Sequence, residues 1–183
     1  MTRVAVLSDT HSYDDLRETV PEWVRAEVEA AEYAVHAGDF VTPTAVEFFR
    51  DLATELVAVR GNADVGVDLP EVATLPVGDV RLVVTHPPGV EDASLDRAAY
   101  DRAVLSAVES VGDTAADDRP VVAVAGHTHR VIDEVVDGVR LLNPGSATAA
   151  LPAERPTMLR LDVSEAEVGV TVLDPEGEHG RGG

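Results

Sequence analysis

The sequence of 183 residues contains no cysteine, which excludes disulfides, thiolate metal sites and a cysteine nucleophile. A transition metal in this protein must therefore be held by His, Asp, Glu or Asn side chains. Long apolar runs are also absent, since none approaches the roughly 18 residues that a membrane-spanning helix needs. The first residues carry one arginine before a short strand-like run and do not resemble a secretion signal. We expect a cytoplasmic protein without membrane contact.

Lysine is absent too, so the 14 basic residues are all arginine, and 34 acidic residues bring the net charge to −20. Such acidity is expected of a halophilic protein from a salt-saturated cytoplasm, where salt screens the repulsion between carboxylates within about 3 Å at 1 M. The other interpretation is that the charge repels polyanions, which argues against nucleic acid as a partner. Both interpretations stay open, and nucleic acid is the less expected partner.

The length predicts a single domain, because domains usually run to about 100–200 residues. A hydrophobic content of 45% is enough for a sizeable core. We place this domain at residues 1–173, because the final segment DPEGEHGRGG has no apolar periodicity. Residues 174–183 are therefore predicted to form a flexible C-terminal tail.

Five short apolar runs, rich in β-branched residues, predict buried strands in the first 125 residues. They are Val4–Leu7, Tyr33–His36, Glu55–Val59, Val80–Val84 and Val121–Ala125. Helical patterns lie between several of them, at Asp14–Ala31, at Pro43–Leu52 with Thr42 as N-cap, and at Leu95–Val111 with Ser94 as N-cap. Strands that alternate with helices predict an α/β architecture.

The last third of the chain changes to hairpin patterns. The runs Val131–Val136 and Val139–Leu142 flank Asp137-Gly138, a dipeptide suited to a type I′ turn. Two more strand-like runs follow at Thr157–Val163 and Val168–Leu173. Together with the earlier strands and helices, these hairpins predict two β-sheets packed face to face with helices outside.

Polar residues follow each of the first five predicted strands at its carboxyl end. In chain order these segments contain Asp9 and His11, Gly38-Asp39, Gly61-Asn62, His86, and Gly126-His127-Thr128-His129. Because ligands of α/β folds bind at the carboxyl ends of strands, we expect these segments to meet at one site. The glycines let the backbone turn sharply before a functional residue.

Seven side chains in these segments are candidate metal ligands: Asp9, His11, Asp39, Asn62, His86, His127 and His129. Their mixture of oxygen and imidazole donors suits Mn²⁺, Fe²⁺, Co²⁺, Ni²⁺ or Zn²⁺ better than Ca²⁺ or Mg²⁺. Seven ligands are too many for one catalytic ion with an open position, and they fit two ions that share a carboxylate. His36, which precedes Gly38-Asp39, is predicted to be a core residue or a support for the ligands.

The ordered motifs D-x-H, G-D, G-N, T-H and G-H-x-H, together with NPGS at Asn143–Ser146, resemble those of the calcineurin-like metallophosphoesterases. The forms SDTH, HAGD and GHTH are most similar to the small prokaryotic phosphodiesterase branch of that family, over roughly residues 3 to 150. The resemblance implies a four-layer αββα sandwich with two mixed β-sheets. It also implies that Asp9, His11, Asp39 and His129 bind one metal, and that Asn62, His86 and His127 bind the other, with Asp39 as the bridge.

The activity that the resemblance implies is metal-dependent hydrolysis of a small or activated phosphodiester by a hydroxide bridging two divalent ions. Mn²⁺ is the favoured metal, and Ni²⁺, Fe²⁺, Co²⁺ and Zn²⁺ are alternatives. The catalytic residues would be Asp39, Asn62 and His86. Two other functions stay open: a protein-interaction scaffold that keeps the phosphoesterase fold, and a nuclease. The oligomeric state, including a homodimer, also stays open.

Two arginines are candidate substrate contacts, because a guanidinium matches phosphate oxygens with two hydrogen bonds. They are Arg60 and Arg130, and the other interpretation is that both are surface charges. Many relatives place a general-acid histidine after the asparagine, whereas this chain has Ala63 and then Asp64. General acid catalysis is typically worth about 10²–10⁴-fold, so its absence favours substrates with good leaving groups. Asp64 is a weak substitute, because a carboxylate near two cations is ionised.

Overall fold

The protein is described here as a computed structural model, which covers residues 1–13, 15–87, 96–112 and 119–181. It contains a six-stranded sheet in the order β11-β10-β9-β1-β2-β3 and a five-stranded sheet in the order β4-β5-β6-β8-β7. The strands of the first sheet are β1 (Thr2–Leu7), β2 (Tyr33–His36), β3 (Leu56–Ala58), β9 (Met158–Ser164), β10 (Glu167–Asp174) and β11 (Gly177–Arg181). Those of the second are β4 (Val72–Val77), β5 (Val80–Thr85), β6 (Val121–Ala125), β7 (Val131–Val136) and β8 (Val139–Pro144).

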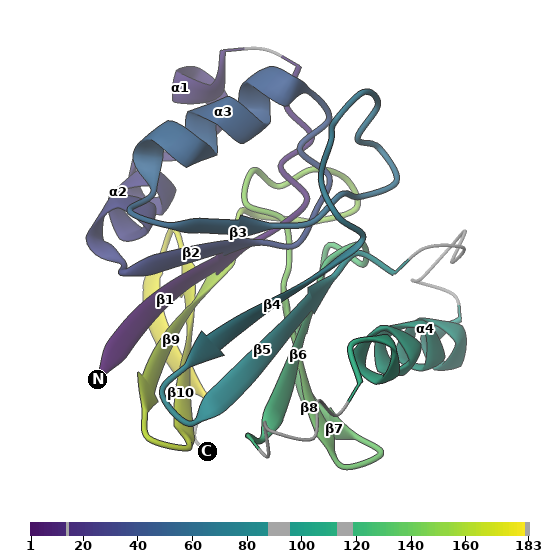
Figure 1. Ribbon diagram of the computed structural model, residues 1–183. Coiled ribbons are helices and arrows are strands. Elements are labelled where there is room, and N and C mark those ends of the chain that lie inside the picture. The colour runs from purple at the N-terminus through teal and green to yellow at the C-terminus, as the bar shows by residue number, and fades with distance from the viewer. Residues whose placement is uncertain (14, 88–95, 113–118, 182–183) are drawn as a thin grey trace.

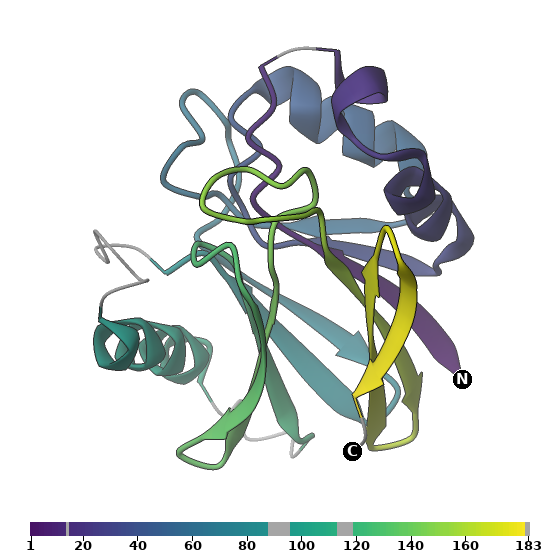
Figure 2. The ribbon, with the colours of Figure 1, turned by 180° about the vertical axis from the view of Figure 1, so that it is seen from behind.

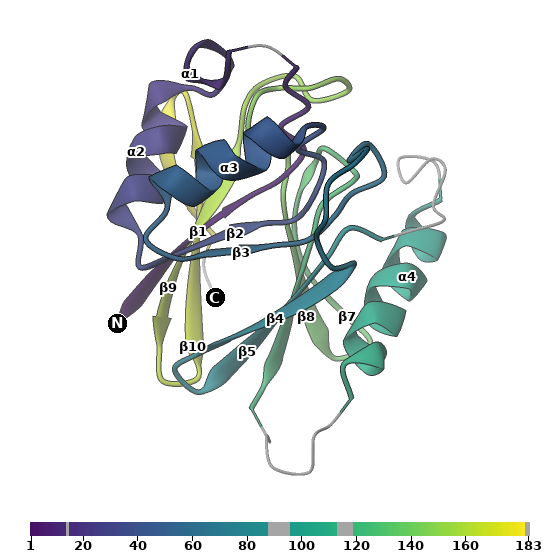
Figure 3. The same ribbon diagram turned by 45° about the horizontal axis from the view of Figure 1, so that its top comes forward.

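Both sheets are mixed, as predicted. In the first sheet β1 pairs in parallel with β2 and in antiparallel with β9. In the second sheet β6 lies parallel to β5 and β8, while β7 and β8 form the predicted hairpin. The helices α1 (Leu16–Thr19), α2 (Glu22–Ala30) and α3 (Pro43–Leu52) lie over the outer side of the first sheet, and α4 (Arg97–Ser110) lies over the outer side of the second (Figures 1 and 3). The predicted four-layer α/β sandwich is confirmed.

The apolar strands are buried on both faces, and their side chains alternate between two cores. In β1, Val4 and Val6 face the second sheet, where they join Leu82 and Val124 in the core between the sheets. Ala5 of the same strand belongs to the core under α2 and α3. A third core, which includes Tyr100 and Val104 of α4, covers the far side of the second sheet. Runs without polar alternation therefore form the central strands, because helices and the opposite sheet cover both faces.

The predicted helix at Asp14–Ala31 is in fact two helices. Asp14 lies outside the described residues, α1 ends at Thr19, and α2 begins at Glu22. Val20 between them is extended, with φ −82° and ψ 118°, because the ring of Pro21 disfavours helical backbone in the preceding residue. The prediction for Pro43–Leu52 is confirmed, and Thr42 accepts the cap hydrogen bond from the Ala45 amide. The third helix begins at Arg97 with Asp96 as its N-cap, and the predicted cap Ser94 lies outside the described residues.

The prediction of a flexible tail over residues 174–183 is wrong for residues up to 181. Asp174 is the last residue of β10, and β11 (Gly177–Arg181) turns back to pair with that strand in antiparallel register. β11 is an exposed edge strand whose backbone bonds hold it in the sheet, so it needs no apolar pattern. An ion pair of 2.7 Å between Arg160 and Glu178 adds a contact between β9 and β11. The edge strand β4 also had no counterpart in the sequence prediction.

The described residues that directly follow the carboxyl ends of β1, β2, β3, β5 and β6 gather at one end of the sandwich (Figure 2). Backbone hydrogen bonds connect them: the amides of Asp9 and His11 donate to the carbonyls of Gly38 and Asp39, each at 3.0 Å. This cluster of loops therefore positions the polar residues that the sequence singled out.

Within the described ranges, every helix falls short of the length and apolar character that crossing a membrane requires.

Candidate metal centre

The structure brings all seven predicted ligands together in two adjoining groups. The first group is Asp9, His11, Asp39 and His129, which offer ligand atoms that all lie within 4.8 Å of one another. The second group is Asn62, His86 and His127, in which Asn62 Oδ1 lies 3.0 Å from His86 Nε2 and 2.8 Å from His127 Nδ1. These residues come from five different loops, so the expected convergence at the strand ends is observed.

Asp39 lies between the two groups. Its Oδ2 atom is 3.1 Å from His11 Nε2 of the first group and 3.4 Å from His86 Nε2 of the second. Its Oδ1 atom accepts a hydrogen bond of 2.8 Å from the amide of Ala63, which fixes the rotation of the carboxylate. The residue is buried, with 1% of its surface exposed, and in this orientation it presents Oδ2 to both groups.

Five of the seven residues have backbone conformations in the left-handed region. The φ angles are 52° for Asp9, 41° for His11, 60° for Asp39, 79° for His127 and 56° for His129. Such angles are uncommon outside glycine and cost free energy, so they persist only where the surroundings enforce them. The clustering of strained residues in these loops is typical of a functional site.

Glycines allow the loops to approach one another closely. A Cβ atom on Gly61 would lie 2.1 Å from Asp39 Oδ1, and one on Gly126 would lie 2.1 Å from Ser8 Oγ. Gly38 has a φ of +91°, and a Cβ there would lie 2.7 Å from His86 Nδ1. The glycines that precede the ligand residues are therefore required by close backbone packing as well as by sharp turns.

Two histidines are oriented so that a bare ring nitrogen faces the site. The Ala37 carbonyl lies 2.8 Å from His86 Nδ1, and the Ala150 carbonyl lies 2.9 Å from His129 Nδ1. Since a carbonyl only accepts, each Nδ1 carries the hydrogen and each Nε2 presents its lone pair inward. This arrangement, with the second ring nitrogen bonded to a carbonyl, is the one that metal-binding histidines adopt.

The donor atoms fit a divalent cation better than they fit one another. The lone pair of His86 Nε2 faces two further acceptors, Asn62 Oδ1 at 3.0 Å and Asp39 Oδ2 at 3.4 Å. In the first group, His11 Nε2 is buried and makes no hydrogen bond with the described residues, although it lies 3.1 Å from Asp39 Oδ2. Donor atoms that converge in this way need either a proton on an imidazole or a cation among them, so the residues fit bound metal.

The charges of the centre follow from its burial and its ion pairs. Burial raises the pKa of Asp39, but the neighbouring His11 and His86 outweigh burial and bring that pKa down to about 2. Burial lowers the pKa of His129, yet contact with Asp9 at 3.2 Å raises it more strongly. His36 is fully buried against Phe40, and burial keeps its pKa well below the usual range. Asp39 is therefore a carboxylate near neutral pH, while His36 is a neutral core residue.

Asp64 holds two loops together, whereas the sequence suggested a weak substitute for a general acid. It is 6% exposed and accepts three backbone hydrogen bonds, from Asp39 at 3.1 Å, Val41 at 2.6 Å and Gly61 at 2.7 Å. Val41 has a φ of 84°, a strained angle for a β-branched residue. The carboxylate of Asp64 thus holds the loop of Asp39 to the loop of Asn62, and none of these bonds leaves it free to serve as a general acid.

The NPGS segment supports the centre from outside, which sequence reasoning did not predict. The Asn143 side-chain amide donates to the Gly126 carbonyl at 2.9 Å and contacts the Thr128 hydroxyl at 3.0 Å. The Ser146 hydroxyl donates to the Asp9 carbonyl at 2.8 Å. The signal in the sequence was a polar motif directly after a strand, but only the fold shows that it contacts loops that lie far away along the chain.

The two arginines that were candidate substrate contacts lie at the surface. Arg60 is exposed and forms an ion pair of 2.8 Å with Glu71. Arg130 is also exposed, and its backbone amide bonds to the Thr128 hydroxyl at 3.2 Å. Their part in substrate binding stays a prediction.

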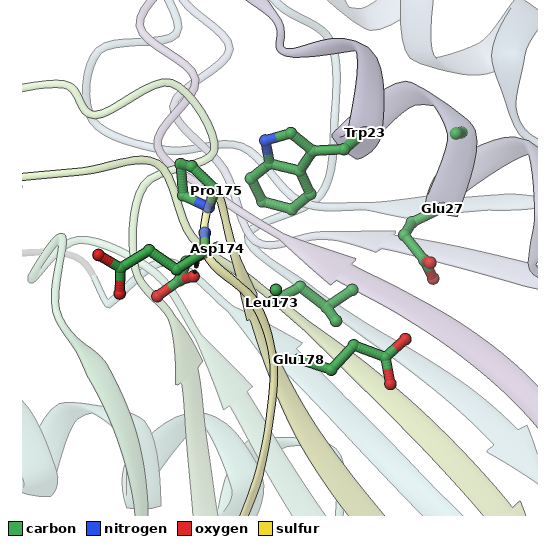
Figure 4. A pocket seen from close by; sticks show the side chains of 9 residues that line it. Trp23, Glu27, Leu173, Asp174, Pro175 and Glu178 are labelled. Carbon is green, nitrogen blue, oxygen red and sulfur yellow. Dashed lines mark hydrogen bonds between the residues drawn. The ribbon is translucent and has the colours of Figure 1, made fainter.

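A cavity of about 360 Å³ lies between α2 and the β10–β11 hairpin. The residues that line it include Trp23, Leu173 and Pro175 (Figure 4). None of the seven predicted ligands lines it. Beside it, Asp174, Glu176 and His179 offer a second group of donor atoms. There, however, Asp174 is already paired with Arg155 and with His179 at 3.2 and 3.1 Å. The seven residues at the strand ends are therefore the better candidate for a functional site.

Comparison with known proteins agrees with this choice. Residues 2–166 match the calcineurin-like phosphoesterase superfamily domain. A probable metallophosphoesterase of Methanocaldococcus jannaschii is 32% identical over 145 residues, which are 79% of this chain and 68% of that protein. A phosphodiesterase of the same organism is 23% identical over 187 residues, which cover 94% of this chain and 99% of that protein. A single mutant of Vps29 from Entamoeba histolytica has the same fold, with a TM-score of 0.75, 21% identity, and coverage of 98% of this chain and 97% of that chain.

Proposed function

The chain belongs to the calcineurin-like phosphoesterase superfamily, and on that premise we propose that it hydrolyses a small phosphodiester with two divalent metal ions. The observation that carries the proposal is the position of Asp39, whose Oδ2 atom lies within 3.4 Å of histidines from both ligand groups. A carboxylate shared in this way is what a pair of ions requires.

In this proposal Asp9, His11 and His129 hold one ion, Asn62, His86 and His127 hold the other, and Asp39 is shared. When bound, a pair of divalent ions supplies an activated water for in-line attack at phosphorus and positive charge for the phosphate oxygens. The protein holds the side chains of the ligands in fixed positions. Ala37 and Ala150 fix His86 and His129, and the amide of His127 donates to both oxygens of Asp9 at 3.0 and 3.2 Å.

The leaving group receives no proton from the residues that follow Asn62. Ala63 has no titratable group, and Asp64 is occupied by three backbone amides. Loss of a general acid typically costs about 10²–10⁴-fold, and the loss is smallest when the leaving group is a stable anion. We therefore propose activated or aryl diesters as the best substrates, with Mn²⁺ favoured among the metals that suit mixed oxygen and imidazole ligands.

A protein-interaction scaffold is the second candidate, and its support is the shared fold with Vps29, of which the Chaetomium thermophilum protein has been crystallised with a bound cyclic peptide. At 21% identity that likeness concerns the fold alone. The presence of seven converging donors favours the enzyme, because a scaffold has no need for them. A nuclease has less support, since the chain carries a net charge of −20 and would repel a polyanion.

The test is to remove metal and restore it. Protein treated with a chelator should lose hydrolysis of bis(p-nitrophenyl) phosphate and should recover it when Mn²⁺ is added, with two ions bound per chain by elemental analysis. The assay is run at low and high KCl, so that an effect of salt on this acidic chain is not mistaken for a metal effect. A protein that binds two ions but hydrolyses neither mono- nor diesters would favour the scaffold.

A further inference from the structure

A second cavity, of about 280 Å³, opens directly beside the metal centre. His11 belongs to both sites, because its ring lines the cavity while its Nε2 atom lies 3.1 Å from Asp39 Oδ2. A group that fills the cavity therefore lies next to a phosphate held at the metal centre. Nothing in the proposed hydrolysis uses this space.

Among the described residues that line the cavity, His11 alone has an ionisable imidazole or a formal charge. The other described residues that line it are Thr10, Ser12, Tyr13, Thr19, Thr148 and Ala150. This composition differs from the chain as a whole, in which 26% of residues are charged. Because these described residues include neither arginine nor a carboxylate, they would neither neutralise a second phosphate nor pair with a cation. The chemistry of the cavity thus selects an uncharged group.

The serine and threonine hydroxyls in the walls already have partners within the protein. Thr10 Oγ1 bonds to His36 Nε2, and Ser12 Oγ bonds to Thr19 Oγ1, each at 2.8 Å. The Thr148 hydroxyl donates to the Thr10 carbonyl at 2.6 Å. Because these groups are engaged, the walls offer a ligand contact area and hydroxyl oxygens that can accept a further hydrogen bond. A flat ring that gains from contact area suits such walls.

Tyr13 is the large side chain available for that contact. It is 77% exposed in the structure, although it lines the cavity two residues after His11. The cavity is slightly smaller than the roughly 300–1,000 Å³ of sites for drug-sized ligands, so it accommodates a single ring system. A ring of this kind stacked on an aromatic side chain commonly strengthens binding about tenfold or more.

We propose that this cavity binds an uncharged ring on the ester group that stays attached to phosphorus, so that the protein selects diesters with an aryl or nucleoside-type group. The inference rests on the proposed phosphodiesterase function. We assign the cavity to the retained ester group and not to the leaving group. Negative charge develops on the leaving oxygen during hydrolysis, and the described residues of the cavity offer no arginine or lysine to stabilise that charge.

Binding without turnover gives the first test. Phenylphosphonate and methylphosphonate carry the same anionic head, and only the first has a ring on phosphorus. In metal-loaded protein, calorimetry should give a Kd about tenfold lower for phenylphosphonate, and the ratio should fall to about one in Tyr13→Ala. Tyr13→Phe should keep the ratio, as should the control Val135→Ala, which changes a residue that is 70% exposed on the distant strand β7. An equal ratio in Tyr13→Ala and wild-type protein would overturn the assignment.

Kinetics with matched substrates give the second test. Bis(p-nitrophenyl) phosphate and methyl p-nitrophenyl phosphate share a leaving group and differ in the retained group. Tyr13→Ala should raise KM about tenfold for the first and less than about twofold for the second. Equal losses on both substrates would mean that the ring of the leaving group occupies the cavity, which overturns the proposal. If loaded wild-type protein hydrolyses neither diester, the proposed function fails, whereas the phosphonate ratio still tests the cavity.

Discussion

Asp39→Asn is expected to lower kcat/KM by more than about 10³-fold while leaving the fold intact. Both ligand groups lose Asp39 Oδ2, a carboxylate oxygen that lies within 3.4 Å of a histidine in each. Even the outer partners of metal ligands typically cost about 10–100-fold when they are removed, so a shared ligand should cost more. The measurement is steady-state hydrolysis of bis(p-nitrophenyl) phosphate in Mn²⁺, with circular dichroism to show that the fold is retained.

Asp174→Asn provides the matched control for that variant. Asp174 is also a buried aspartate, at 5% exposure against 1% for Asp39, and it also lies among other donor atoms. It sits at the end of β10 and pairs with Arg155, away from the ligand groups. Its activity should stay within about twofold of wild type. Near wild-type turnover in Asp39→Asn would contradict a centre built on two ions.

Asp64→Ala is expected to lower the free energy of unfolding by about 3 kcal/mol or more. The substitution leaves three amides, those of Asp39, Val41 and Gly61, without their acceptor, and each buried unsatisfied group costs about 1–3 kcal/mol. Urea denaturation of metal-free protein measures the stability, and metal-free conditions separate it from stabilisation by bound ions.

Asp68→Ala is the control for this second variant, because Asp68 is an exposed aspartate a few residues further along the chain. It should change stability by no more than about 0.5 kcal/mol. We expect Asp64→Ala also to lose activity about tenfold or more, since the loops of Asp39 and Asn62 are no longer held together. A stable and fully active Asp64→Ala would show that these hydrogen bonds do not position the centre.

The residues of the centre could be predicted from sequence because the folding pattern and the chemistry point to the same places. Asp9 and Asp39 follow the neighbouring parallel strands β1 and β2 of the first sheet, and His86 follows β5 of the second, so that strand ends of both packed sheets meet at the centre. Glycines before Asp39 and His127 marked close approach of the backbone, which the structure bears out. The apolar strand pattern was enough to predict a ligand's position wherever that ligand directly follows a strand.

Other features depended on contacts that no local pattern contains. The break between α1 and α2 is signalled by Pro21, but the apolar spacing of Leu16, Val20 and Val24 continues across it. The strand β11 is held by backbone pairing with β10, so its polar composition gave no sign of it. Asp64 resembled a loop carboxylate until its three amide partners, which belong to two different loops, were known.

The most direct test of the account is a crystal structure of protein grown with Mn²⁺, with anomalous scattering measured at the manganese absorption edge. The account predicts two peaks, one among Asp9, His11 and His129 and one among Asn62, His86 and His127, with Asp39 in contact with both. A single peak, or His86 and Asn62 turned away from the second position, would contradict it.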